Sequence, residues 1–180
     1  SREDLYQRYF HGEKFKVLDS VKEIGEDGVF VHVTTKRSPW LDGRPHGDFK
    51  TLPLLREAGF QAAGLWEMVE LSRMALPRSV ESLELGHGIA DAMASGIEVR
   101  RRTHQSDGTL FDVWVKAGGG ESKLLMRGYS SVKLRDLDPQ ERFEPVVADG
   151  NTPHMVIVDA EEIERELAAD RRGVLAKYLS

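Results

Sequence analysis

The chain has 180 residues, of which 40% are hydrophobic and 31% charged, an ordinary composition for one soluble globular domain with a short appendage. The net charge of −5 at pH 7 argues against nucleic acid as a partner, because a surface that binds polyanions needs a basic excess. The absence of cysteine excludes disulfides and thiolate metal sites, and the lack of a long apolar run predicts a cytoplasmic protein with no membrane span.

The first predicted elements are two strands, at 15–24 and 28–35. Both are rich in β-branched and apolar residues, and the sequence GEDG between them is a hairpin turn signal. A loop with two prolines follows at 36–49. We therefore expect the chain to open with an antiparallel hairpin.

A long helix is predicted from about Lys50 to Arg73. Pro53 is tolerated in its first turn, and Pro77 stops the chain beyond it. The helix sequence AGFQAAGLWEMV is apolar on most faces, which is typical of a helix buried on all sides. Its small residues would let strands approach closely.

More strand-like segments come after the helix. In one of them, Phe111, Val113 and Val115 alternate with Asp112 and Lys116, the pattern of a half-buried antiparallel strand. The predicted segments are 79–85, 96–104, 109–117 and 122–134.

The order is thus two strands, one long helix and then four strands. This order predicts an α+β hotdog fold, in which an antiparallel sheet wraps around one long central helix. We assign residues 1–135 to this domain. Residues 136–180 have the composition of a linker followed by a helix, and we interpret them as a linker and the start of a following domain. The chain begins without methionine and stops within this helical sequence, which predicts a piece of a longer protein.

Glu57 and Gln61 stand out inside the buried helix, four residues apart on one face. Gln61 can orient the Glu57 carboxyl group through a hydrogen bond. Burial should raise the pKa of Glu57 toward neutrality, which suits a general acid or base, although the helix dipole opposes that shift. The alternative interpretation is a carboxylate at an exposed helix end, paired with Arg56 or Lys50.

Several segments resemble one family of enzymes. The helix sequence EAGFQAAG resembles a motif of bacterial 3-hydroxyacyl-acyl carrier protein dehydratases, in which the glutamate is the catalytic carboxylate. The chain as a whole, over roughly residues 6–135, is similar to the C-terminal hotdog half of polyketide or polyunsaturated fatty acid synthase dehydratase domains. The matching segments are YFHGEKFKVLDSV (9–21), LPLLREAGFQAAG (52–64) and ALPRSVESLEL (75–85).

The resemblance implies elimination of water from a 3-hydroxyacyl thioester, with Glu57 as the catalytic acid and Gln61 as its orienting partner. The substrate would arrive on the phosphopantetheine of an acyl carrier protein, so no metal and no diffusible cofactor is expected. Such synthases usually carry aspartate at the position of Glu57. Their catalytic histidine lies in the preceding half, in a His-x-x-x-Gly-x-x-x-x-Pro motif that this chain lacks.

Two histidines are candidates to complete such a site. His46 lies in the loop before the helix, where dehydratases with a single hotdog place theirs, and it is the first choice. His11 belongs to the opening segment and is the second. We expect the other four to be strand, packing or tail residues: His32, His87, His104 and His154.

Four large side chains of the helix, Phe60, Leu65, Trp66 and Met68, are expected in the core. In this fold the acyl tunnel follows the central helix, so one or two of them would also contact substrate.

Two other functions remain open. A hotdog thioesterase would use the helix carboxylate to activate water, and a non-catalytic hotdog would serve as an acyl-binding or assembly module. For the dehydratase we expect three kinds of partner: an acyl carrier protein, the adjacent synthase domains, and a second hotdog. The second hotdog is either the N-terminal half that bears the histidine or a second copy of this chain in a homodimer. The tail helix (160–180) is also similar to the start of a phosphopantetheinyl transferase segment, with a plain linker helix as the alternative.

Overall fold

The computed structural model describes residues 2–9, 11–12, 15–33, 53–86, 94–117 and 122–143. The predicted tail helix therefore lies outside the described residues. The helices within these ranges are α1 (Arg2–Arg8) and α2 (Pro53–Glu70), followed by the short 3-10 helix η5 (Pro139–Glu141). The strands are β1 (Leu18–Gly25), β2 (Gly28–Val33), β3 (Arg73–Ser79), β4 (Ser82–Leu85), β5 (Ala94–Gln105), β6 (Gly108–Ala117) and β7 (Ser122–Asp136).

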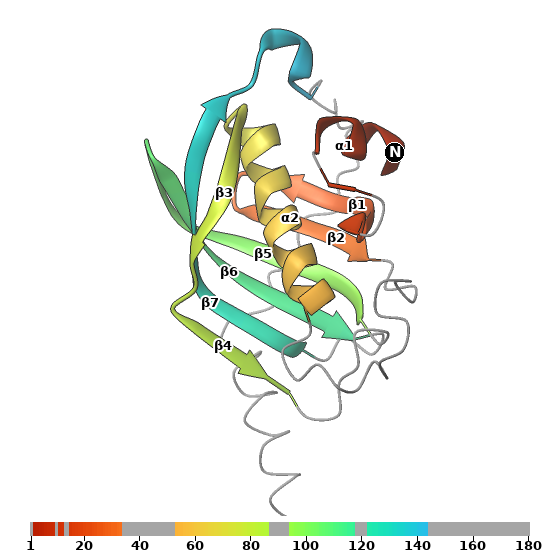
Figure 1. The fold of residues 1–180 in the computed structure, drawn as a ribbon. Coiled ribbons are helices and arrows are strands. Elements are labelled where there is room, and N and C mark those ends of the chain that lie inside the picture. Colours follow the sequence, from red (N-terminus) through yellow and green to blue (C-terminus); the bar gives the residue numbers. More distant parts are fainter. Residues whose placement is uncertain are drawn as a thin grey trace, which may run out of the picture.

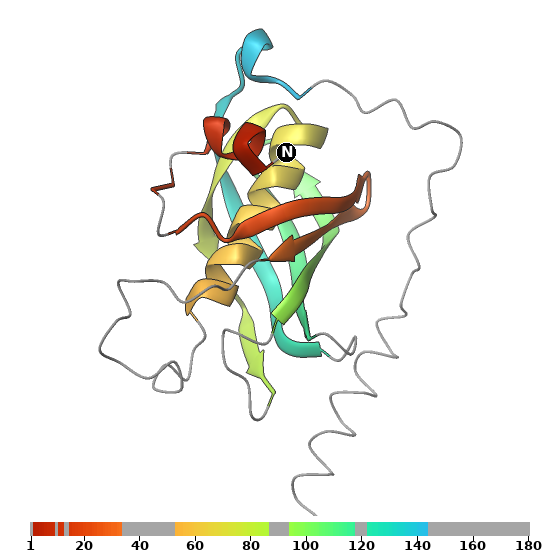
Figure 2. The same ribbon diagram turned by 90° about the vertical axis from the view of Figure 1, so that its right-hand side faces the viewer.

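The strands form one antiparallel sheet around α2. Within the described residues the sheet has seven strands, in the order β1-β2-β5-β6-β7-β3, with β4 paired to β7. Figures 1 and 2 show the sheet curled around α2, with α1 beside the helix. The predicted hotdog architecture is confirmed.

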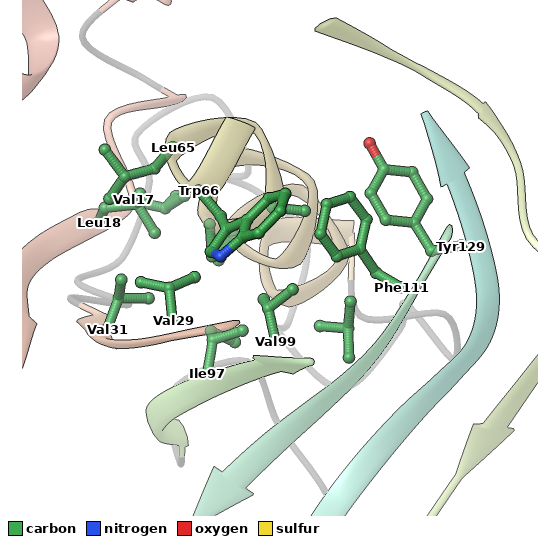
Figure 3. Close-up of a cluster of buried hydrophobic side chains, with 14 of the residues drawn as sticks. Val17, Leu18, Val29, Val31, Leu65, Trp66, Ile97, Val99, Phe111 and Tyr129 are labelled. Atoms are coloured by element: carbon green, nitrogen blue, oxygen red, sulfur yellow. The ribbon is translucent and has the colours of Figure 1, made fainter. Parts of the chain in front are cut away.

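Helix α2 is buried along most of its length, as its composition predicts. Leu55, Ala58 and Ala62 have no exposed surface, and Trp66 is 2% exposed. Figure 3 shows Trp66 between the helix and the strands, close to Phe111. The two rings meet edge to face with centroids 5.5 Å apart, and the Trp66 indole donates a hydrogen bond of 2.7 Å to the Gly25 carbonyl. The core thus lies between α2 and the concave face of the sheet.

Strand β6 confirms the predicted alternation. Phe111, Val113 and Val115 are fully buried on the helix side. The neighbouring Trp114 is also buried, at 4% exposure, on the opposite face of the strand. Arg100 lies over its ring at 5.2 Å. The outward face of this strand is therefore less polar than alternation alone suggests.

The prediction for residues 71–85 was wrong in detail. The helix ends at Glu70, and residues 73–79 form strand β3 rather than the last helical turn and a stop. The predicted strand at 79–85 is the shorter β4. Among the described strands, β3 lies at the end of the sheet order and pairs on one side only. Pro77 is tolerated there because a proline, which has no backbone N–H, removes no hydrogen bond on the unpaired side of an edge strand.

Helix α1 was not predicted. Its Leu5 and Tyr6 are buried against the core, and Arg8 joins it to the end of the chain that the structure describes. The Arg8 guanidinium donates to the Glu141 carbonyl at 2.8 Å and lies 4.5 Å from the Phe143 ring centroid. Neither of the described α-helices is long and apolar enough to cross a membrane.

Candidate active site

Glu57 and Gln61 meet as their spacing predicts. They lie on one face of α2, and Gln61 Nε2 donates a hydrogen bond of 2.8 Å to Glu57 Oε1. Gln61 is buried at 2% exposure, whereas the Glu57 side chain is 25% exposed. The Glu57 carboxylate is therefore held by a buried hydrogen-bond donor and still reaches solvent. The alternative of a plain exposed helix end does not describe it.

The Gln61 amide has a fixed orientation. Its Oε1 accepts the Tyr6 hydroxyl proton at 2.8 Å, and its Nε2 donates to the Phe15 carbonyl at 2.7 Å as well as to Glu57. The Tyr6 hydroxyl in turn accepts the Leu18 backbone N–H at 2.7 Å. Because the Tyr6 hydroxyl donates to the amide oxygen and the Phe15 carbonyl accepts one amide N–H, the other N–H faces Glu57. Helix α1 and the start of β1 thus position the carboxylate indirectly.

His11 also contacts Glu57, although sequence reasoning placed it second. Its Nε2 lies 2.9 Å from Glu57 Oε1, and its side chain is 14% exposed. The Tyr9 ring packs edge to face against the imidazole with centroids 5.1 Å apart. The sequence signal that pointed to His11 was its place in the segment 9–21. The first choice, His46, lies outside the described residues.

The predicted direction of the Glu57 pKa was wrong. Burial is the largest single influence and raises the pKa, but it is outweighed by three effects that lower it. These are the hydrogen bonds from His11 and Gln61 and the charge of His11, which together hold the pKa of Glu57 below its ordinary value. Glu57 is consequently a carboxylate at neutral pH, and it does not rest as a neutral acid.

The remaining described histidines lie elsewhere. His32 on β2 and His104 on β5 are exposed, as expected of strand-surface residues. His87 and His154 fall outside the described residues. Within the ranges the structure describes, no group of three or more His, Asp or Glu side chains is arranged to hold a metal ion.

A pocket extends from the Glu57–His11 pair along α2. It runs between the helix and β3 and is partly open to solvent. One end is polar and the other apolar, so the Glu57–His11 pair faces a hydrophobic wall. The lining residues are Tyr9, His11, Glu57, Phe60, Gln61, Gly64, Met68, Met74, Ala75, Leu76 and Pro77.

Two of the four large helix residues named from the sequence, Phe60 and Met68, line this pocket. Leu65 and Trp66 belong to the core alone. Gly64 leaves room for Tyr9, whose hydroxyl donates to the Gln61 carbonyl oxygen and would lie 3.2 Å from a Cβ added at Gly64. The pKa of Tyr9 is raised well above its ordinary value, chiefly by burial, so Tyr9 enters the site as a neutral hydroxyl.

The fold recurs in solved structures. A dehydratase domain of a trans-AT polyketide synthase from Brevibacillus brevis aligns with a TM-score of 0.59 at 19% identity, over 76% of this chain and 46% of that one. The dehydratase domain of PpsC from Mycobacterium tuberculosis gives a TM-score of 0.61 at 15% identity, over 76% and 51%. A hypothetical thioesterase from Streptococcus pneumoniae, solved with coenzyme A, gives 0.56 at 13% identity, over 77% and 100%. At these identities the likeness establishes the hotdog fold.

The chain spans about half the length of the two dehydratase domains, 46% and 51%. No curated protein sequence matches it significantly. The family described as "polyketide synthase dehydratase N-terminal domain" matches residues 2–141, which is most of the chain. The chain therefore belongs to the polyketide synthase dehydratase family.

Proposed function

We propose that this hotdog is a dehydratase half-domain that eliminates water from a 3-hydroxyacyl thioester carried by an acyl carrier protein. One observation carries the proposal. In a chain of the dehydratase family, the Glu57 carboxylate is held by Gln61 at 2.8 Å and faces a pocket whose far end is apolar. The carboxylate supplies acid–base chemistry, and the apolar wall suits an acyl chain.

The sequence resemblance supports a finer proposal, the C-terminal half of a double hotdog, whereas the family model that matches is the one for the N-terminal domain. Glu57 and Gln61 lie on the central helix where the resemblance places the catalytic carboxylate and its partner. The segment 9–21 leads into the first strand of the hairpin and contributes His11 to the site. In this arrangement a second hotdog lies beside the first and the adjacent synthase domains flank the pair. No cofactor beyond the carrier's phosphopantetheine is required.

The product distinguishes the competing functions. The chain, with its neighbouring synthase segments supplied, would be given a 3-hydroxyacyl pantetheine thioester and the products identified by mass spectrometry. We expect an enoyl thioester and water, and a loss of about 10²- to 10⁴-fold in rate for Glu57→Gln. Glu70→Gln, an exposed carboxylate at the end of the same helix, is the matched control. Retained dehydration in Glu57→Gln would contradict the assignment.

A thioesterase is the second candidate, because Glu57 is held as a carboxylate and could activate water. The structural match to the streptococcal thioesterase covers all of that chain. This function predicts a free acid and a thiol in the same assay. A non-catalytic acyl-binding hotdog predicts that the thioester is bound and recovered unchanged.

A further inference from the structure

The pocket is a groove between two elements that run in opposite directions. Glu57, Gly64 and Met68 line it from one face of α2, and the lining on β3 extends from Met74 to Pro77. The chain reverses between the helix and the strand, so β3 returns alongside α2 (Figure 1). Met74 therefore lies toward the Met68 end of the groove, and Pro77 lies toward the Glu57 end.

The chain itself closes the groove beyond Met68 and Met74. Residues 71 and 72 alone join α2 to β3. Just past the two methionines, the buried Arg73 donates a hydrogen bond of 2.8 Å to the buried Glu67, which fixes the strand to the helix. The opposite end, at the carboxylate, reaches solvent. The groove is therefore open near the reactive group and blind at the two methionines.

The middle of the groove depends on a residue without a side chain. The Tyr9 hydroxyl, which donates to the Gln61 carbonyl oxygen, would lie 3.2 Å from a Cβ added at Gly64. A larger residue at this position would narrow the path between the reactive end and the methionines. At the blind end, Met68 is 1% exposed and Met74 is half-buried, so both offer apolar surface to a chain that reaches them.

We propose that this groove limits the length of the acyl chain, with Met68 and Met74 as its end and Gly64 as the residue that keeps the path to them open. The inference rests on the proposed dehydratase function, in which Glu57 meets the β-hydroxyl and the rest of the acyl chain follows the apolar wall. It adds a substrate class to that function, namely 3-hydroxyacyl thioesters of medium chain length.

Helix geometry gives the length. Met68 is 11 residues beyond Glu57, which is about 16 Å along a helix that rises about 1.5 Å per residue. A long helical side chain leans toward the N-terminus, so Met68 itself takes part of this distance and leaves about 12 Å. An extended alkyl chain, with carbon–carbon bonds of about 1.5 Å, advances about 1.25 Å per carbon. The groove then holds about ten carbons beyond the β-carbon.

The first experiment measures binding, which needs no turnover. The chain, with its neighbouring synthase segments supplied, is titrated calorimetrically with 3-hydroxyacyl pantetheine thioesters whose acyl chains grow by two carbons at a time. We expect the affinity to rise by up to about tenfold per step while each added methylene is buried. It should stop rising at about ten carbons beyond the β-carbon. An affinity that does not depend on length, or no binding at any length, would overturn the inference.

The second experiment moves the blind end. Met68→Ala should shift the break in affinity to chains that are longer by about two carbons, because the groove then extends into the vacated space. Met74→Ala is the second variant, since a half-buried side chain costs less stability to remove. Met126→Ala is the matched control, because Met126 is a fully buried methionine outside the set of residues that line the groove. An unmoved break in both groove variants would contradict the proposal.

A substitution at Gly64 should act in the opposite direction. Gly64→Leu places a side chain in the middle of the groove, so it should weaken binding of the longest chains by about 10²-fold or more. The shortest chains, which do not reach this point, should bind within about threefold of wild type and serve as the internal control. Equal weakening at every length would mean that the substitution only disturbs the site, and the proposed role of Gly64 would be wrong.

Failure of this inference is distinguishable from failure of the proposed function. If enoyl thioester forms equally well at every chain length, and the groove variants leave that profile unchanged, the inference is wrong and the dehydratase function stands. If the break in affinity appears and moves as expected but no enoyl thioester forms with the neighbouring segments present, the groove limits acyl length and the dehydratase function fails.

Discussion

A buried ion pair that is separate from the pocket holds the end of α2 in place. Glu67 is fully buried and accepts a hydrogen bond from Arg73 Nε at 2.8 Å and another from the Ser131 hydroxyl. Arg73 also donates to the Thr109 hydroxyl at 2.8 Å and to the Gln105 carbonyl at 3.1 Å. One guanidinium thus links the helix, β3 and the β5–β6 hairpin.

We expect Arg73→Met to destabilise the fold by about 3–5 kcal/mol, because it leaves the Glu67 carboxylate buried without its cation. The matched control is Lys133→Met. Lys133 pairs with Asp136 at 2.7 Å, but the two side chains are 33% and 70% exposed, so its loss should cost less than about 1 kcal/mol. Urea unfolding measures the free energy of unfolding of both variants and of the wild type. Equal costs for the two variants would show that the buried pair has no special role.

The sequence could predict part of the site and could not predict the rest, for a reason visible at single residues. Glu57 and Gln61 are one helical turn apart, so their contact follows from helix geometry. The contact between His11 and Glu57 depends on how the N-terminal segment folds back over α2, and no periodicity encodes that. The predicted direction of the shift in the Glu57 pKa was wrong for the same reason. It depends on the two donors that meet at Oε1.

The elements that were predicted well are those that can be recognised from their own residues, without knowledge of their neighbours in the fold. Helix α2 is apolar on most faces, and β6 alternates. Helix α1 has seven residues, too few to be stable alone, and it exists because Leu5 and Tyr6 reach the core. Strand β3 was missed because Pro77 normally ends an element. Its position at the end of the sheet order removes that objection.

The packing of α2 against the sheet depends on a glycine. A Cβ added at Gly59 would lie 2.4 Å from Met126 Cε and 3.0 Å from Val113 Cγ1. Alanine improves helix propensity by up to about 1 kcal/mol. The Met126 side chain can move, but the branched Val113 on β6 is stiff, so the helix and sheet must separate.

We therefore expect Gly59→Ala to destabilise the protein by about 1–3 kcal/mol despite its better helix propensity. Gly25→Ala is the control, because a Cβ there meets nothing within 4 Å and should change stability by no more than about 0.5 kcal/mol. Thermal unfolding compares the stabilities of the two variants with that of the wild type. A Gly59→Ala variant more stable than wild type would mean that this interface is looser than the described contacts indicate.

At the scale of the whole molecule, the pocket lies beside a sheet edge. Its outer wall is β3, which among the described strands pairs on one side only, with β7. An edge strand has unpaired N–H and C=O groups that can accept another strand. A second hotdog at this edge would extend the sheet and close the pocket near Glu57. In the proposed double hotdog this is where the other half would lie, and a second copy of the chain can take its place.

We accordingly expect the isolated chain to form a homodimer, which sedimentation should detect at micromolar concentration as twice the chain mass of 20.2 kDa.

The lack of cysteine allows the interface to be located by cross-linking. Single cysteines would be introduced in turn at Pro77, Arg78 and Ser79, which are exposed on β3, and as a control at Ser20, exposed on β1. A disulfide requires a distance of roughly 4.4–6.8 Å between the two Cα atoms. If two β3 edges pair with two-fold symmetry, a residue near the symmetry axis lies within this distance of its own copy. At least one β3 variant should therefore cross-link on mild oxidation. The Ser20 variant should remain uncross-linked, because β1 lies at the opposite end of the sheet order. A folded monomer at these concentrations would contradict the homodimer. Cross-linking of the Ser20→Cys variant instead of the β3 variants would show that the chains do not pair through β3.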